Sequence, residues 1–293
     1  MKLGQSDIDV GKISFGCWRF AKHDVSTADG LIRTALDAGM NLIDTADIYG
    51  LGDFPKREDG GFGQAEERLG EVLAAAPSLR KQIILATKGG IDAKRPYDSS
   101  RAYLTKAIEA SLTRLRTDYV DLYQIHRPDL TTPASETAQA LNEIVASGKA
   151  RAIGVSNFSA AQTRALQKHL DHPIATVQPE FSALEQSPVT DGILDYAQET
   201  GATVLAWSPL AGGRIPTESG PVQTALDEIA TRYGISRSVA ALAFTRGFGA
   251  TVIPIIGTQN PDRIRESGYA AQVNLTGRET YDIIEALRGE TMP

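Results

Sequence analysis

Four polar side chains in the first half of the sequence have the chemistry to deliver a proton to a substrate oxygen: Asp44, Tyr49, Lys88 and His126. A phenol with a pKa of about 10 is a poor acid at neutral pH, but a neighbouring ammonium group lowers that pKa by stabilising the phenolate. Lys88 can supply this charge, Asp44 can keep the lysine protonated, and His126 can donate a hydrogen bond to the same oxygen. Taken singly, these residues are typical of helix caps, solvated loops and turns, so the prediction depends on all four lying together.

The four residues follow short apolar runs that alternate with segments of helical periodicity. Eight such runs have the content of buried strands: residues 13–18, 41–45, 83–88, 119–126, 150–156, 174–178, 202–208 and 251–257. Repeated strand-then-helix units indicate parallel strands that are buried on both faces. The sequence therefore predicts an α/β fold, a single (β/α)8 TIM barrel domain over residues 1–293. An open, doubly wound sheet is the alternative.

The segments between the strands carry helix signals. Within residues 100–115, one apolar stripe is formed by Leu104, Ile108, Leu112 and Leu115. Ser159 and Gln162 have the spacing of a capping box, and Pro133 suits the first turn of a helix. Extra C-terminal helices are predicted over residues 220–234, 236–247 and 277–289.

Further polar residues stand where the later strands end: Ser156, Asn157, Gln178, Trp207 and Ser208. In a (β/α)8 barrel the carboxyl ends of all strands meet at one face, where the chemistry takes place. We therefore expect these side chains to join Asp44, Lys88 and His126 at one end of the barrel.

The composition of the 293 residues narrows the classes of partner. The net charge is −6 and the 30 Lys and Arg are scattered, so neither nucleic acid nor an anionic membrane is favoured. Cys17 is the only cysteine, which excludes an intramolecular disulfide and a cysteine-rich zinc site and suits a reducing compartment. The first 16 residues lack the apolar core of a secretory signal, and no apolar stretch approaches the ~20 residues of a membrane span. A cytoplasmic protein that acts on small molecules, without a metal, is expected.

Residues 51–63, LGDFPKREDGGFG, form an insert directly after Tyr49. Their glycines, proline and mixed charges are typical of a loop. The position beside the candidate site favours a substrate-gating role, and a neutral surface insertion is the alternative.

These motifs together resemble the aldo-keto reductase family over nearly the whole chain. NLIDTADIYG resembles its Asp and Tyr motif, ATKGG its lysine strand and DLYQIHRPD its histidine strand, while GKARAIGVSNFS and AWSPLAGG resemble its cofactor motifs. The resemblance is strongest to a short bacterial branch of predicted oxidoreductases. It implies that Tyr49 is the general acid of a carbonyl reduction, with Asp44, Lys88 and His126 in supporting roles.

The same resemblance implies a nicotinamide cofactor that lies extended across the barrel mouth. Ser156, Asn157 and Gln178 match the positions that bind the carboxamide, and Trp207 replaces a tyrosine that stacks on the nicotinamide ring. The pyrophosphate loop matches Ser208, Pro209, Leu210, Gly212, Gly213 and Arg214, where glycines let backbone N–H groups approach phosphate. Residues of the first strand end also belong to the implied cofactor site, namely Gly16, Cys17 and Trp18.

The segment PIIGTQNPDRIRES predicts a strand, a turn and a helix that begins at Asn260 and Pro261. A helix N-terminus with Thr258 before it and Arg263 in its first turn suits an anion. In the family this segment binds the adenosine 2′-phosphate, which implies NADPH rather than NADH. Two cofactor-site positions depart from the family pattern, since Gly257 replaces a lysine and Ser267 replaces an asparagine.

The expected substrate is an aldehyde or ketone of modest size, in an apolar and partly aromatic pocket formed by Trp18, Tyr49, Phe54 and Phe62. Two other classes of function remain open. Lys88 would attack a carbonyl directly in a Schiff-base aldolase, although Asp44 beside it opposes this by keeping the amine protonated. A nicotinamide-binding sensor or channel-associated subunit without turnover would use the same residues. The oligomeric state is not indicated.

Overall fold

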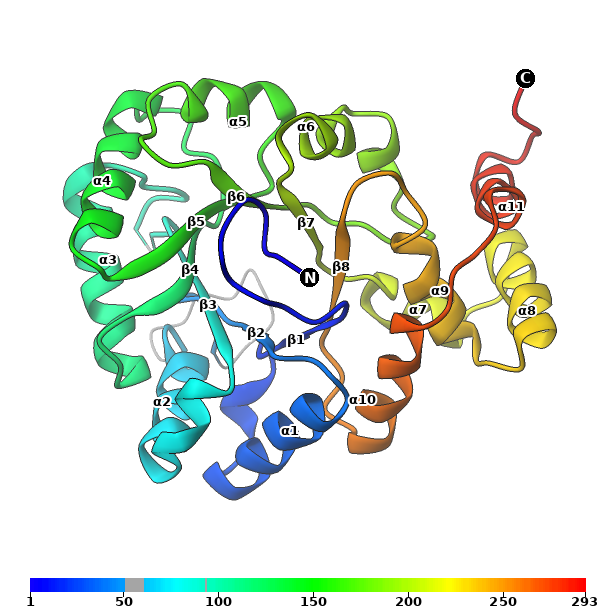
Figure 1. Cartoon of the computed structure of the whole chain (residues 1–293), viewed down its shortest axis with the longest axis horizontal. Coiled ribbons are helices and arrows are strands. Elements are labelled where there is room, and N and C mark those ends of the chain that lie inside the picture. Colours follow the sequence, from blue (N-terminus) through cyan, green and yellow to red (C-terminus); the bar gives the residue numbers. More distant parts are fainter. Residues whose placement is uncertain (51–60, 93) are drawn as a thin grey trace.

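The computed structural model describes residues 1–50, 61–92 and 94–293. Eight parallel strands close into a barrel in chain order (Figure 1). The strands are β1 (Ser14–Gly16), β2 (Leu42–Asp44), β3 (Ile84–Gly89), β4 (Val120–Ile125), β5 (Ala150–Ser156), β6 (Ile174–Gln178), β7 (Thr203–Ala206) and β8 (Val252–Ile256). Because β1 pairs with β8, with Ser14 opposite Ile255, the sheet closes on itself. The predicted (β/α)8 barrel is confirmed, and the open sheet is wrong.

Helices surround the barrel on its outer side (Figure 1). The α-helices between β1 and β7 are α1 (Val25–Asp37), α2 (Gln64–Ala75), α3 (Arg101–Leu115), α4 (Ala134–Ala146), α5 (Ala160–Gln167) and α6 (Ile193–Thr200). Those that follow β7 are α7 (Arg214–Thr217), α8 (Pro221–Tyr233), α9 (Arg237–Thr245), α10 (Pro261–Gly268) and α11 (Gly277–Arg288). Short 3-10 turns lie at η1 (Phe20–Lys22), η2 (Pro77–Lys81), η3 (Ser187–Val189), η4 (Ala211–Gly213) and η5 (Tyr269–Ala271). Among the described residues, no helix is both long and apolar enough to cross a membrane.

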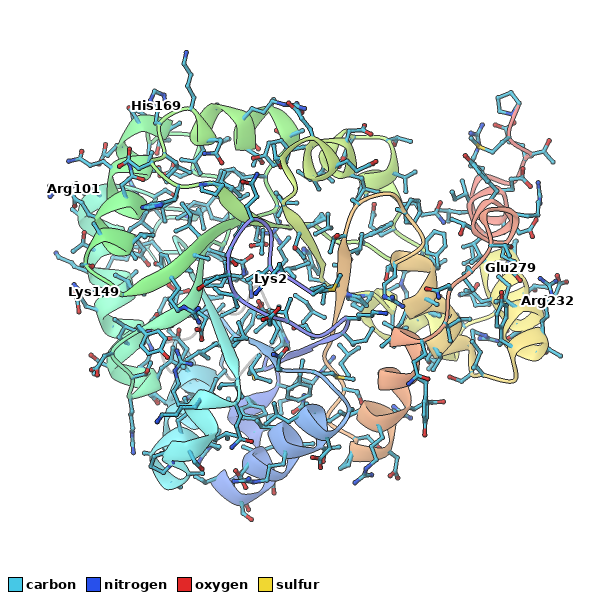
Figure 2. All side chains as sticks on the ribbon, viewed as in Figure 1. Lys2, Arg101, Lys149, His169, Arg232 and Glu279 are labelled. Atoms are coloured by element: carbon cyan, nitrogen blue, oxygen red, sulfur yellow. The ribbon has the colours of Figure 1, made fainter. Side chains whose placement is uncertain are left out.

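The local helix signals act as expected. The predicted apolar stripe of α3 is buried, and Ser159 and Gln162 form a capping box at the start of α5. Pro133 lies one position earlier than predicted, at the N-cap of α4 rather than in its first turn. The extra C-terminal helices are confirmed as α8, α9 and α11. Figure 2 shows Arg232 of α8 and Glu279 of α11 close together at the edge of the molecule, where they form an ion pair.

The barrel interior is apolar at its N-terminal end and polar at its C-terminal end. The N-terminal segment, dark blue in Figure 1, crosses the middle of the barrel, and Leu3, Ile8 and Val10 are buried there. These three residues pack with the inward-facing side chains Leu42, Ala86, Leu122, Ala152, Ala175, Leu205, Ile253 and Ile255. Apolar side chains therefore fill the N-terminal end of the barrel. The buried polar side chains of the candidate site lie at the C-terminal end.

A buried polar cluster braces the outer side of β3, the strand that carries Lys88. Glu66 of α2 accepts hydrogen bonds from Thr87 Oγ1 at 2.5 Å and from Arg114 Nε at 2.7 Å, which ties α2 to β3 and α3. Asp47 is buried nearby, and no side chain among the described residues donates a hydrogen bond to its carboxyl oxygens. Burial, followed by the charge of Glu66, raises the pKa of Asp47 well above its ordinary value. Asp47 therefore keeps its proton to higher pH in the folded protein than an ordinary aspartate does.

The raised pKa of Asp47 makes stability depend on pH. In the unfolded chain Asp47 loses its proton near pH 4, whereas the folded protein retains it to higher pH, so rising pH above about 4 favours unfolding. Asparagine cannot ionise, so we expect Asp47→Asn to remove this loss of stability at higher pH. The difference in urea midpoint between Asp47→Asn and the wild type should grow in favour of the variant from pH 5 to pH 8. Asp37→Asn, at an exposed position, serves as the control. A difference for Asp47→Asn that stays constant with pH would contradict the raised pKa of Asp47.

Candidate active site

Lys88 lies at the centre of the polar end of the barrel and is completely buried. Its Nζ donates to Asp44 Oδ2 at 2.5 Å, to the Thr45 carbonyl oxygen at 2.9 Å and to the Tyr49 hydroxyl at 3.2 Å. Three of the four predicted residues are thus joined through one ammonium group. They meet because β2 and β3 are adjacent and parallel, so their carboxyl ends coincide.

The protonation states within this group follow from burial and from the ion pair. Burial by itself lowers the pKa of Lys88, but Asp44 and then Tyr49 outweigh it, so the net pKa is raised and the lysine stays an ammonium. The net pKa of Tyr49 is also raised, because burial exceeds the lowering effect of Lys88. The expectation that Lys88 brings the phenol pKa below its ordinary value is therefore wrong for this structure. Lys88 offsets part of the burial penalty, and Tyr49 is a fully protonated phenol at neutral pH.

His126 completes the predicted set at the end of β4. Its ring lies edge to face with Tyr49, with 5.8 Å between the ring centroids. Burial lowers the pKa of His126 well below its ordinary value, and the charges of Lys88 and Arg127 lower it further. The imidazole is therefore neutral at pH 7 and carries a single N–H. Its Nδ1 is buried without a partner among the described residues.

The end of β1 adds an aromatic side to the site. Trp18, which is 44% exposed, contacts Tyr49 with 4.8 Å between ring centroids. Cys17 is buried behind it, and its pKa is raised, first by burial and then by Asp44, so it is a neutral thiol. A Cβ at Gly16 would approach Ile255 Cγ2 to 3.0 Å, so the glycine allows β1 and β8 to lie close together.

The residues expected to bind the nicotinamide carboxamide form hydrogen bonds with one another and with their neighbours. Asn157 donates through Nδ2 to the His126 carbonyl oxygen at 3.0 Å and to Ser156 Oγ at 2.9 Å. Its Oδ1 accepts from the Trp207 indole Nε1 at 3.0 Å, which orients the ring. Gln178 donates to Asp44 Oδ1 at 3.1 Å. The structure therefore brings these residues together with the Lys88 cluster in one hydrogen-bonded network.

The loop after β7 contains several residues in the left-handed backbone region, at Ser208, Ala211, Gly212 and Gly213. A Cβ at Gly212 or Gly213 would meet nothing within 4 Å, so this side of the loop is open. Pro209 is buried, Leu210 packs against the core, and Arg214 is exposed at the start of α7. An exposed loop with successive left-handed residues is suited to an anion.

The loop after β8 does not offer the free helix N-terminus expected for an anion. Asn260 caps α10 and accepts from the backbone N–H groups of Asp262 and Arg263, so these donors are already occupied. The Ser267 hydroxyl likewise donates to the Arg263 carbonyl oxygen at 2.8 Å. The guanidinium of Arg263 and the hydroxyl of Thr258 are therefore the groups that remain for an anion.

Sequence reasoning missed Arg19, which stands three residues after the end of β1. Its Nη1 donates to the Gly257 carbonyl oxygen at 3.1 Å and lies 3.5 Å from where a Cβ at Gly257 would be. A cation from the segment after β1 thus lies beside position 257, at ordinary contact distance from where a side chain would begin. Arg127 was missed as well, although it stands directly after His126 at a strand end. Its guanidinium lies 5.9 Å from the centroid of the Trp207 ring.

The charges around the barrel mouth fit a phosphorylated dinucleotide. Arg19, Arg214 and Arg263 are exposed and form no ion pair with any described residue. Most other arginines of the described chain are paired with carboxylates, as Arg265 is with Asp262 at 2.8 Å. Arginines without an ion-pair partner, at the mouth of a chain with a net charge of −6, therefore match phosphate groups.

The expected gating loop lies mostly outside the described residues, as does Phe54. Phe62 is described and is 41% exposed, and the Arg114 guanidinium lies 5.8 Å from its ring centroid. Arg114 also binds Glu66 on the outer side of β3. Phe62 therefore lies beside the Glu66 and Arg114 pair on the outer side of β3. Trp18 and Tyr49, by contrast, contact one another at the site.

Comparisons with known proteins agree with this arrangement. The Aldo/keto reductase family profile matches residues 12–288. The chain is 47% identical to a 6-dehydroglucose reductase of Novosphingobium aromaticivorans, over all of this chain and 96% of that protein. It is 34% identical to a 6-dehydroglucose reductase of Agrobacterium fabrum, over 96% of each chain.

Solved structures show the same fold. A glycerol dehydrogenase from Gluconobacter oxydans superposes with a TM-score of 0.82 at 29% identity, over 98% of this chain and 95% of that one. An aldo/keto reductase from Klebsiella pneumoniae in complex with NADP and acetate superposes with a TM-score of 0.80 at 26% identity, over 97% and 93%. With the barrel and the Asp44, Tyr49 and Lys88 cluster in place, the chain belongs to the aldo/keto reductase family of oxidoreductases.

Proposed function

We propose that this protein uses NADPH to reduce the aldehyde group of an oxidised sugar, with Tyr49 as the proton donor. The observation that carries the proposal is the contact of 3.2 Å between the buried Lys88 ammonium and the Tyr49 hydroxyl. Bound NADPH supplies the hydride. Tyr49 gives its proton to the carbonyl oxygen, and Lys88 stabilises the phenolate that remains. Asp44 keeps Lys88 charged, and neutral His126 can donate a hydrogen bond to the same oxygen.

The cofactor part of the proposal is supported by the unpaired arginines at the mouth and by the open loop after β7. Ser156, Asn157 and Gln178 lie beside the Lys88 cluster, where they would hold the carboxamide, and Trp207 offers a ring that Asn157 orients. Arg263, with Thr258 nearby, would bind the 2′-phosphate that distinguishes NADPH from NADH. Arg19 adds a second cation beside Gly257.

The substrate part is supported by the two relatives named 6-dehydroglucose reductase. It revises the expectation of a mainly apolar pocket. Arg127 is half-buried beside His126, and it forms no ion pair with a described residue. Its guanidinium carries donors that suit the hydroxyl groups of a sugar. Trp18 provides an exposed aromatic face close to Tyr49.

Schiff-base chemistry does not fit this geometry. A nucleophilic lysine must be a neutral amine. Lys88 instead forms three hydrogen bonds as a donor, one of them in a buried ion pair. A cofactor-binding protein without turnover remains compatible with the same contacts, and only a kinetic measurement separates it from the enzyme.

Oxidation of NADPH by a panel of carbonyl compounds tests the proposal. We expect the highest kcat/KM for 6-dehydroglucose, intermediate values for short hydroxyaldehydes and the lowest for aliphatic aldehydes of the same length, because only the first two groups use the donors of Arg127. Arg127→Leu should reduce the difference in kcat/KM between the hydroxylated and the aliphatic aldehydes. Negligible turnover of every carbonyl, with NADPH bound, would instead favour a binding protein.

Tyr49→Phe removes only the hydroxyl group and retains the ring contacts with Trp18 and His126. We expect kcat to fall by about 10²–10⁴-fold, the usual contribution of a general acid, while the NADPH dissociation constant stays near that of the wild type. Lys88→Met should cause a similar loss, and the double variant should be barely worse than either, because the two residues act as a unit. Near wild-type turnover by Tyr49→Phe would refute the assignment of the proton donor.

Arg263→Ala tests the choice of cofactor. A charge-assisted hydrogen bond contributes about 1.5–3 kcal/mol, so the variant should bind NADPH roughly 10- to 100-fold more weakly and NADH almost unchanged. Arg265→Ala is the matched control, since Arg265 lies on the same helix and is paired with Asp262. Fluorescence titration with both cofactors measures the effect. An equal loss for NADPH and NADH would show that Arg263 does not contact the 2′-phosphate.

A further inference from the structure

A chain of buried polar side chains extends from the Lys88 cluster across the barrel interior. Gln178 of β6 donates through Nε2 to Asp44 Oδ1 at 3.1 Å and approaches Gln124 Oε1 of β4 at 3.5 Å. Gln124 Oε1 also accepts from Thr176 Oγ1 at 3.0 Å. Thr176 and Gln124 are fully buried. The chain therefore continues two residues beyond the groups that the proposed reaction uses.

A missing side chain on β5 makes room for this chain. Gly154 lies between Gln124 and Thr176 in the strand register. A Cβ at position 154 would come within 2.0 Å of Thr176 Oγ1 and 3.1 Å of Gln124 Cγ. The two side chains can therefore meet across β5 only because residue 154 is glycine.

The orientation of each amide in the chain is determined by its neighbour. Asp44 is a carboxylate and can only accept, so the NH₂ group of Gln178 must face it, and the Gln178 oxygen points elsewhere. No described residue donates to that oxygen, which leaves it for a ligand. Gln124 supports the same orientation, because rotating its amide would bring its NH₂ group against that of Gln178. Gln124 Oε1 can accept from both Thr176 Oγ1 and Gln178 Nε2.

In this orientation the NH₂ group of Gln124 has no acceptor. Its Nε2 is buried and has no hydrogen-bond partner among the described residues. A buried, unpaired amide N–H is destabilising. Packing by itself would favour an apolar side chain of similar size at this position, so the polar residue needs another explanation.

We propose that Gln124 is a positioning residue, which acts through Gln178 and Asp44 without touching the substrate. It fixes the amide face that Gln178 presents at the barrel mouth and limits the movement of the Asp44 carboxylate that holds Lys88. Thr176 anchors Gln124 from the far side. The inference rests on the proposed function, in which Gln178 contacts the cofactor and Asp44 supports Tyr49.

The test separates positioning from packing. Gln124→Met has nearly the same volume, removes the acceptor oxygen and also removes the unpaired donor. A packing role predicts equal or greater stability with unchanged activity. A positioning role predicts an unchanged or raised urea midpoint together with a roughly tenfold loss of kcat and a several-fold rise in the NADPH dissociation constant. Gln124→Glu keeps an acceptor oxygen at this place and should restore most of the NADPH affinity.

Two threonine variants provide the controls. Thr176→Val removes the anchor and should show a smaller loss than Gln124→Met, with a double variant no worse than Gln124→Met. Thr203→Val removes another buried hydroxyl, one that accepts from the Gly4 N–H at 2.8 Å, and should lower stability without changing kcat. If the wild type binds NADPH but reduces no carbonyl, the proposed function fails, whereas the change in NADPH affinity still tests Gln124. Wild-type affinity and turnover in Gln124→Met would overturn the inference.

Discussion

The buried ion pair between Lys88 and Asp44 is the constraint on which the rest of the site depends. An ammonium group with no exposure to solvent is stable only when a carboxylate and further acceptors replace the lost water. Asp44 and the Thr45 carbonyl do so, and the Tyr49 hydroxyl takes the third position around Nζ. The same burial raises the pKa of Tyr49 and lowers that of His126, so both remain neutral beside a permanent positive charge.

The fold protects this pair from both sides. The N-terminal segment fills one end of the barrel with apolar side chains, so water reaches the polar groups only from the other end. Behind β3, Glu66 ties α2 to the strand and to Arg114. Inside the barrel, Gln178 continues the network away from Asp44. Each of these contacts limits the movement of a strand end that carries a residue of the candidate site.

In the proposed function, recognition of the cofactor and the substrate depends on the loops around the Lys88 and Asp44 pair. The arginines at the mouth come from different segments of the chain, since Arg19 follows β1, Arg214 begins α7 and Arg263 lies in α10. They form no ion pair with a described residue, whereas Arg265 and Arg278 are paired with carboxylates. Arg19 shows that one loop can supply a charge to another, because it follows β1 and lies next to Gly257 of the loop after β8. The chemistry is therefore common to the family, while the choice of ligand belongs to individual loop residues.

Periodicity and strand-end polarity were sufficient to predict the barrel, its C-terminal helices and the meeting of Asp44, Tyr49 and Lys88, because parallel strands bring their carboxyl ends together whatever their side chains. The tertiary structure alone decided the effects that depend on distance and burial across strands. Burial reversed the expected shift of the Tyr49 pKa, Asn260 occupied the helix donors expected for an anion, and Arg19 reached Gly257 across 238 positions of sequence. Gln124 had no visible role in the sequence, since its partners Thr176 and Gln178 lie more than 50 positions away and meet it only inside the closed barrel.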